Sequence, residues 1–102
     1  MGNAAARALT NALTCTGFES TVAAMSAKEL TVPRGAVLAV CQVQGEPLRY
    51  RMDGEDPTAA TGAEGQPGEK ITIDGQKDMA NFRFIRHADS EPGGKLACHY
   101  YK

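Results

Sequence analysis

The sequence predicts an all-β fold: a small antiparallel β-sandwich, of the jelly-roll or immunoglobulin-like kind, that carries an N-terminal arm. Three observations support this prediction. The 102 residues suit one domain that can bury a single core. After residue 27, short runs alternate between apolar and polar side chains, as half-buried strands do. Gly, Pro and Asp separate these runs at the spacing expected for turns in a sandwich or barrel.

Six runs are predicted to form strands, over residues 29–32, 36–44, 48–52, 70–73, 82–86 and 96–101. The third run alternates cleanly, with Arg49 and Arg51 directed away from its apolar face. The second run begins apolar on both faces, which indicates a central strand. Asp74-Gly75 is a hairpin signal between the fourth and fifth runs. The core residues expected from the alternation are Leu48, Tyr50, Ile71, Ile73, Phe82 and Phe84.

The first 26 residues differ in composition and are predicted to form an N-terminal arm, followed by a sandwich domain of residues 27–102. Ala, Thr, Ser and Asn dominate this segment. Its large apolar residues recur roughly every four to five positions, which favours a short helix over residues 4–13, although Thr and Asn are poor helix formers. A partly helical arm and an extended arm therefore both remain open.

Charge distinguishes a docking arm from a solvated tail. Before Lys28 the segment carries only Arg7 and Glu19, whereas a disordered tail is usually rich in charge. We therefore expect the arm to lie on a neighbouring subunit. One of the two adjacent tyrosines near the C-terminus must also face away from the core, because neighbours in a strand point in opposite directions. The expected partner-contacting residues are Leu9, Leu13, Phe18, Val22 and Tyr101.

The overall charge and the cysteines bear on partners and compartment. Eleven basic and twelve acidic residues give a formal net charge of -1, which argues against a nucleic-acid partner. No apolar stretch approaches the length of about 18 residues that a membrane span needs, so no membrane partner is expected.

The three cysteines, Cys15, Cys41 and Cys98, are odd in number and widely spaced. We therefore expect reduced thiols and folding in a cytoplasm.

The sequence holds no catalytic constellation, so neither enzymatic activity nor a cofactor is expected. His87 and His99 are the only histidines. Cys98 and His99 are adjacent, so a strand directs them to opposite faces and they cannot form a nucleophile–base pair. Cys41 could approach either histidine, but a buried structural thiol is the favoured interpretation.

Residues 50–70 are the most distinctive segment and are predicted to form an ordered loop. The glycines supply permissive backbone positions, the proline fixes its own φ, and the threonine hydroxyls can bond to nearby backbone groups. The acidic residues beside Gly54 lack the ligand spacing of a calcium-binding EF-hand, so no metal site is expected. The expected turn motif consists of Asp53, Gly54, Pro57, Thr58 and Gly62.

Several short motifs, taken in order, resemble a pattern found in small virion proteins of tailed bacteriophages. They are LTVP-x-GA over 30–36, RYRMDG over 49–54, PTA over 57–59 with Gly62, FRFI over 82–85, and YY over 100–101. The resemblance covers about residues 28–102 and does not include the first 27. The DG–PT turn by itself also looks like a loop of immunoglobulin-like modules attached to glycoside hydrolases.

The resemblance implies a β-sandwich that sits on or in a phage particle. Proteins of this kind look like capsid decoration (cement) proteins or small head or tail components. The implied partners are the major capsid protein or other virion subunits, bridged by a homo-oligomer that stabilises the shell. The implied location is the virion, assembled in the host cytoplasm. The alternative is a tail or head–tail component that acts as a receptor- or carbohydrate-binding module.

Overall fold

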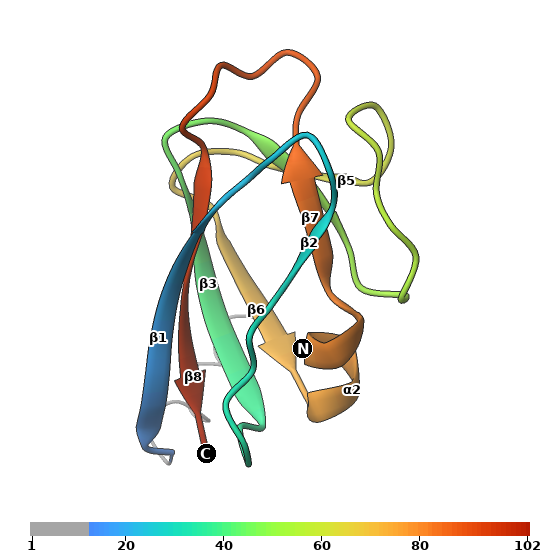
Figure 1. The fold of residues 1–102 in the computed structure, drawn as a ribbon. Coiled ribbons are helices and arrows are strands. Elements are labelled where there is room, and N and C mark those ends of the chain that lie inside the picture. The colour runs from blue at the N-terminus through green and yellow to red at the C-terminus, as the bar shows by residue number, and fades with distance from the viewer. Residues whose placement is uncertain (1–12) are drawn as a thin grey trace.

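The structure is a computed structural model that describes residues 13–102. Two antiparallel four-stranded sheets pack face to face, so the predicted β-sandwich is confirmed (Figure 1). Sheet A contains, in spatial order, β1 (Cys15–Val22), β8 (Lys95–Tyr101), β3 (Leu38–Gln44) and β6 (Lys70–Asp74). Sheet B contains β2 (Lys28–Glu29), β7 (Arg83–Arg86), β4 (Leu48–Arg51) and β5 (Ala63–Gly65).

The strand order is that of a jelly roll and not that of an immunoglobulin-like sandwich. β1 pairs with β8, β2 with β7, β3 with β6, and β4 with β5. The chain is therefore one long ribbon whose two arms stay paired while it wraps around the core, as in the double Greek key of jelly rolls. The β3–β8 and β4–β7 pairings join the segments of this ribbon into two sheets.

A short helix, α2 (Gln76–Asn81), connects the sheets where the sequence predicts a hairpin turn. β6 belongs to sheet A and β7 to sheet B, so the chain must cross between layers and cannot turn directly back. Gly75, with φ at 104°, allows the sharp change of direction, and Met79 anchors the helix by burying its side chain.

Within residues 13–102, no helix is long and apolar enough to cross a membrane.

The predicted N-terminal arm needs correction, because residues 15–22 form β1, an integral strand of sheet A. The sandwich therefore begins before residue 27, and the helix expected over 4–13 lies almost wholly outside the described residues. β1 was not predicted because no large apolar residue points inward from it, so it lacks an alternating apolar pattern. Its inward residues are Gly17, Glu19 and Thr21.

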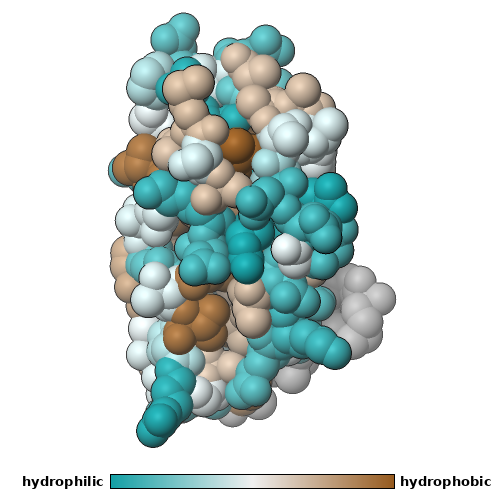
Figure 2. Space-filling model, turned by 45° about the vertical axis from the view of Figure 1, so that its right-hand side comes forward, coloured by the Kyte–Doolittle hydropathy of each residue, from teal (hydrophilic) through white to brown (hydrophobic). Residues whose placement is uncertain are grey.

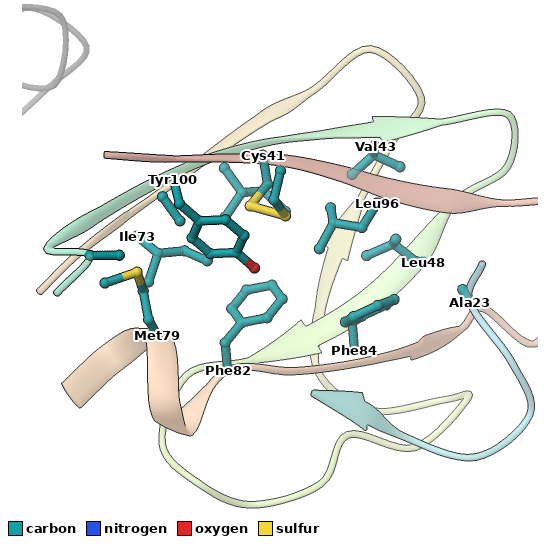
Figure 3. Close-up of a cluster of buried hydrophobic side chains, with 14 residues drawn as sticks. Ala23, Cys41, Val43, Leu48, Ile73, Met79, Phe82, Phe84, Leu96 and Tyr100 are labelled. Atoms are coloured by element: carbon teal, nitrogen blue, oxygen red, sulfur yellow. A yellow bond between two sulfur atoms is a disulfide. The ribbon is translucent and has the colours of Figure 1, made fainter. Parts of the chain in front are cut away.

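Side chains from both sheets meet in one core (Figure 3). Five of the six predicted core residues are confirmed as buried: Leu48, Ile71, Ile73, Phe82 and Phe84. The sixth, Tyr50, is half-buried at the rim, where its ring stacks on Phe82 with centroids 5.5 Å apart. Tyr100 is fully buried, and Figure 3 places its ring between the two sheets.

A disulfide joins Cys41 of β3 to Cys98 of β8 inside this core, so the prediction that all three thiols are reduced is wrong (Figure 3). The two cysteines are 57 residues apart in the sequence. They lie directly opposite each other in the β3–β8 ladder, with Cα atoms 4.0 Å apart. The sequence spacing could not reveal this contact, because it depends on the register of two strands. Cys15 is free and exposed.

Candidate functional site

The loop over residues 52–62 folds back over the outer face of sheet B. Ile85 alternates with the core residue Phe84, so its side chain faces away from the core, yet Ile85 is only 6% exposed. Pro57 of the loop is also buried, and the Ala88 N–H donates to the Ala59 carbonyl at 3.0 Å. The loop therefore covers an outer sheet face that would otherwise expose an apolar residue. Figure 2 shows a largely hydrophilic surface on this side, broken by small separate hydrophobic areas.

The turn residues expected from the sequence hold the loop through short-range bonds. Asp53 accepts hydrogen bonds from the Arg51 guanidinium and, at 3.3 Å, from the Glu55 N–H. The bond to Arg51 lowers the pKa of Asp53 below its ordinary value, because it favours the charged carboxylate. Gly54 has φ at 86°, a region that glycine enters without steric cost.

The tip of the loop is a tight turn closed by two threonines. Thr58 and Thr61 form an antiparallel bridge, with N···O distances of 3.0 and 3.2 Å between their backbones. Their hydroxyl oxygens are 2.6 Å apart. Gly62 follows with φ at 125°, and an added Cβ there would lie 3.2 Å from the Tyr50 carbonyl oxygen. Only glycine therefore lets the loop approach β4 this closely.

Arg49 of β4 ties this loop to the sheet. Its Nε donates to the Ala59 carbonyl at 3.1 Å, and one Nη donates to the Gly62 carbonyl at 2.9 Å. The other Nη lies 3.3 Å from Glu64 Oε1, on the strand directly opposite. The guanidinium thus uses its rigid fork to fix three acceptors, which a lysine could not match.

His87 joins the same cluster from the end of β7. Its Nε2 lies 2.5 Å from Glu64 Oε1, and its Nδ1 lies 3.1 Å from the Asp89 backbone nitrogen. A backbone N–H can only donate, so Nδ1 accepts and the ring proton sits on Nε2, from which it is donated to Glu64. The two contacts therefore hold the imidazole ring in one orientation. We call Arg49, Glu64 and His87 the loop brace.

The loop brace resembles an acid–base site in composition, but its geometry suits a structural role. Both nitrogens of His87 are engaged within the chain, so neither is free to take a proton from a bound molecule. Cys41 is in the disulfide, and His99 lies on the other sheet with its ring centroid 4.7 Å from that of Phe18. Within residues 13–102, no group of His, Cys, Asp and Glu is arranged to hold a metal ion.

Acid should loosen the loop brace through Glu64. The hydrogen bond from His87 lowers the pKa of Glu64 below its ordinary value of 4.5. A carboxylate whose pKa is depressed on folding adds stability above that ordinary value, and the stability is lost as the pH falls through the folded-state pKa. We expect wild type to melt at a higher temperature than Glu64→Gln near neutral pH, with the difference vanishing well below pH 4.5.

Thermal melts of both chains across this pH range measure the effect. Gln keeps a carbonyl oxygen that can accept from His87, so the substitution isolates the charge. A difference in melting temperature that stays constant down to strongly acidic pH would contradict an ionic role for Glu64.

The expected partner-contacting residues within the described part of the chain differ in their exposure. Phe18 and Val22 lie on the outer face of β1 and are 58% and 55% exposed. Leu13 and Tyr101 are half-buried, and Tyr101 pairs with Cys15 across the β1–β8 ladder. Leu9 lies outside the described residues.

A cluster of hydrogen bonds that the sequence did not predict centres on the Glu19 carboxylate of β1. The Tyr100 hydroxyl donates to the Glu19 carboxylate, which also accepts from the Thr31 N–H at 2.9 Å and from the Thr21 hydroxyl at 3.2 Å. Burial, together with this carboxylate, raises the pKa of Tyr100, so the phenol keeps its proton and remains a donor. Glu19 therefore ties β1 to the connection between β2 and β3.

Comparison with protein-family models, curated proteins and solved structures finds no match to the chain.

Proposed function

We propose that this protein is a structural component of a tailed-phage particle: a decoration protein that binds the assembled shell and bridges its subunits without catalysis. The loop brace carries the proposal. Its residues could be mistaken for an active site, but their hydrogen bonds hold a loop rigid against sheet B. A loop fixed in this way presents a constant surface, which lowers the entropic cost of binding a large partner.

The motifs of the resemblance support the same role. The RYRMDG motif contains Arg49 of the loop brace and the turn at Gly54, and the PTA motif forms the loop tip with Thr58. These residues serve the frame of the loop and not a reaction. Jelly rolls recur in viral capsid and lectin domains, which is consistent with the proposal, although a fold alone does not assign a function.

The disulfide is compatible with this setting. Disulfides are rare in a reducing cytoplasm but persist on virion surfaces. In the proposed life cycle, Cys41 and Cys98 are reduced while the particle assembles in the host cytoplasm. On the released particle, dissolved oxygen oxidises the two thiols (2 RSH + O2 → RSSR + H2O2), and burial of the resulting bridge protects it from reductants.

The alternative, a receptor- or carbohydrate-binding module on a tail or head–tail connector, has less support. Carbohydrate sites favour exposed aromatic platforms. Tyr50 stacks on Phe82, and Tyr100 is buried and bonded to Glu19. Only Tyr101, itself half-buried, remains among the tyrosines.

Particles with and without the protein test the proposal. Phage grown from a genome in which the gene is deleted should assemble shells that are less resistant to heat or chelators than wild-type shells. Adding the purified full chain should restore this resistance, with binding that saturates at a fixed ratio to the major shell protein. Tail-less heads should bind as well as whole particles.

Two outcomes would contradict decoration. Absence of the chain from wild-type particles would overturn the virion setting altogether. A few copies that stay with the tails, and binding that a soluble glycan displaces, would favour the alternative module. A chain with Gln76→Ala, at an exposed position of α2 outside the loop brace and outside β1, is the matched control for handling losses.

A further inference from the structure

Among the described residues, β1 is the longest strand at an edge of the sandwich. It forms one edge of sheet A, and Figure 1 shows no described segment beyond it. The other edges are less suited to pairing. β2 and β5 have two and three residues, and β6 carries Lys70 and Asp74 at its ends. Short strands and charges of this kind protect sheet edges from pairing with other chains.

Within residues 13–102, the backbone of β1 has groups on its outer side that meet no backbone partner. The Ala23 N–H donates to the Gly94 carbonyl at 2.8 Å, which extends the β1–β8 ladder by one pair. In an antiparallel ladder, hydrogen-bonded pairs alternate along the strand, so residues 17, 19 and 21 bond toward β8. Phe18, Ser20 and Val22 therefore direct N–H and C=O groups outward, where the described part of the chain offers no backbone partner.

The side chains of this edge lack the usual protection against pairing. Phe18 and Val22 are exposed apolar residues, and β1 contains no Pro, Lys or Arg. Its one charged residue is Glu19, which points inward. An inward charge normally deters strand addition. Here the carboxylate already accepts bonds from Tyr100 and Thr31, so it places no unpaired charge at the edge.

We propose that β1 pairs antiparallel with β1 of a second copy, about a twofold axis at Ser20. In this register Phe18 of each copy lies opposite Val22 of the other, so the interface contains two such pairs. An aromatic residue opposite a β-branched one is a favourable cross-strand pair. The register also sets Glu19 opposite Thr21. Phe18, Ser20 and Val22 of each copy then form three hydrogen-bonded pairs with the other copy. Each pair exchanges two backbone hydrogen bonds, so the interface would contain about six of them and would join the two A sheets into one.

Neighbouring registers are less favourable. An axis at Glu19 would place the two carboxylates opposite each other, where like charges destabilise. An axis at Phe18 would shift the pairing onto the irregular register between Cys15 and Gly17. In the register with its axis at Ser20, the side chains of β1 complement those of a second β1 that is related by a twofold axis. This match between identical strands favours a second copy of the chain over an unrelated partner. The pairing does not depend on the particle setting and is tested on the purified chain alone.

Cross-linking of the full chain tests both the dimer and its register. In a Cys15→Ser background, Ser20→Cys places two thiols opposite each other at the axis, and mild oxidation should give a covalent dimer. Phe18→Cys is the matched control, because its copies would be four residues out of register and should stay uncross-linked. Efficient cross-linking of Phe18→Cys, with none at Ser20→Cys, would overturn the proposed register.

Sedimentation equilibrium tests the pairing without a covalent bond. Ser20→Pro removes an N–H that points away from β8. Because proline is tolerated in an edge strand where its missing N–H would face solvent, β1 should still form. The dimer Kd should rise at least roughly 100-fold, because two hydrogen bonds are lost and two carbonyls stay unpaired. Ser20→Ala keeps the N–H and should leave Kd within a few-fold. A chain that remains monomeric at high concentration, or Ser20→Pro that dimerises like wild type, would overturn the proposal.

Discussion

Replacing Phe84 with alanine is expected to lower the free energy of unfolding by roughly 3–5 kcal/mol. Phe84 is fully buried and packs within the core cluster, with its ring centroid 6.1 Å from that of Phe82. Removing the ring takes away its burial and leaves a cavity that the two sheets can close only in part, because strand pairing fixes their backbones. Urea-induced unfolding followed by circular dichroism measures the change.

The chain provides its own control for this substitution. Phe18→Ala makes the same chemical change on the outer face of β1, where the ring is 58% exposed. At protein concentrations low enough to keep the chain monomeric, its effect should lie within about 1 kcal/mol. Similar losses at the two positions would mean that Phe84 does not occupy the core.

The double substitution Cys41→Ala with Cys98→Ala is expected to cost roughly 2–5 kcal/mol. The two cysteines are 57 residues apart, and in the chain-entropy account a bridge closing such a loop removes about 4 kcal/mol of freedom from the unfolded chain. Both sulfurs are also fully buried, so shortening them leaves space in the core. Denaturation of the wild-type chain with and without a reductant measures the contribution of the disulfide bond alone to the free energy of unfolding.

Alkylation provides the control for the bridge. A thiol reagent applied to the denatured, unreduced chain should label Cys15 only, and all three cysteines after reduction. Cys15→Ala should leave stability unchanged, since its side chain is exposed. Identical denaturation midpoints with and without reductant would show that the two thiols are not bridged in the native protein.

The parts of the fold that follow an alternating apolar pattern could be predicted from the sequence. Within each of these strands the apolar residues occupy alternate positions, and the pleat of the strand directs them all to one face. The buried residues Leu48, Ile71, Ile73 and Phe84 follow this pattern. β1 could not be predicted in this way, because its inward positions hold Gly, Glu and Thr in place of large apolar residues. β5 is too short to show a period, and α2 depends on the crossing between layers.

The candidate site was less accessible to prediction because its members meet only after the sheets form. Arg49, Glu64 and His87 come from three different segments, and no spacing in the sequence links them. The turn chemistry around Gly54 and Thr58 could be read locally, since it depends on neighbouring residues. The Cys41–Cys98 contact required the register of β3 and β8, which composition does not reveal.

The two ends of the described chain lie side by side, and this placement determines how the molecule responds to mechanical load. Thr14 and Lys102 exchange backbone hydrogen bonds of 2.9 and 3.0 Å at one end of the β1–β8 ladder. Tension between these ends pulls across the ladder, so its bonds open one pair at a time and not all together. Peeling of β8 would stop at Cys98, where the covalent link to Cys41 transfers the force to the centre of sheet A.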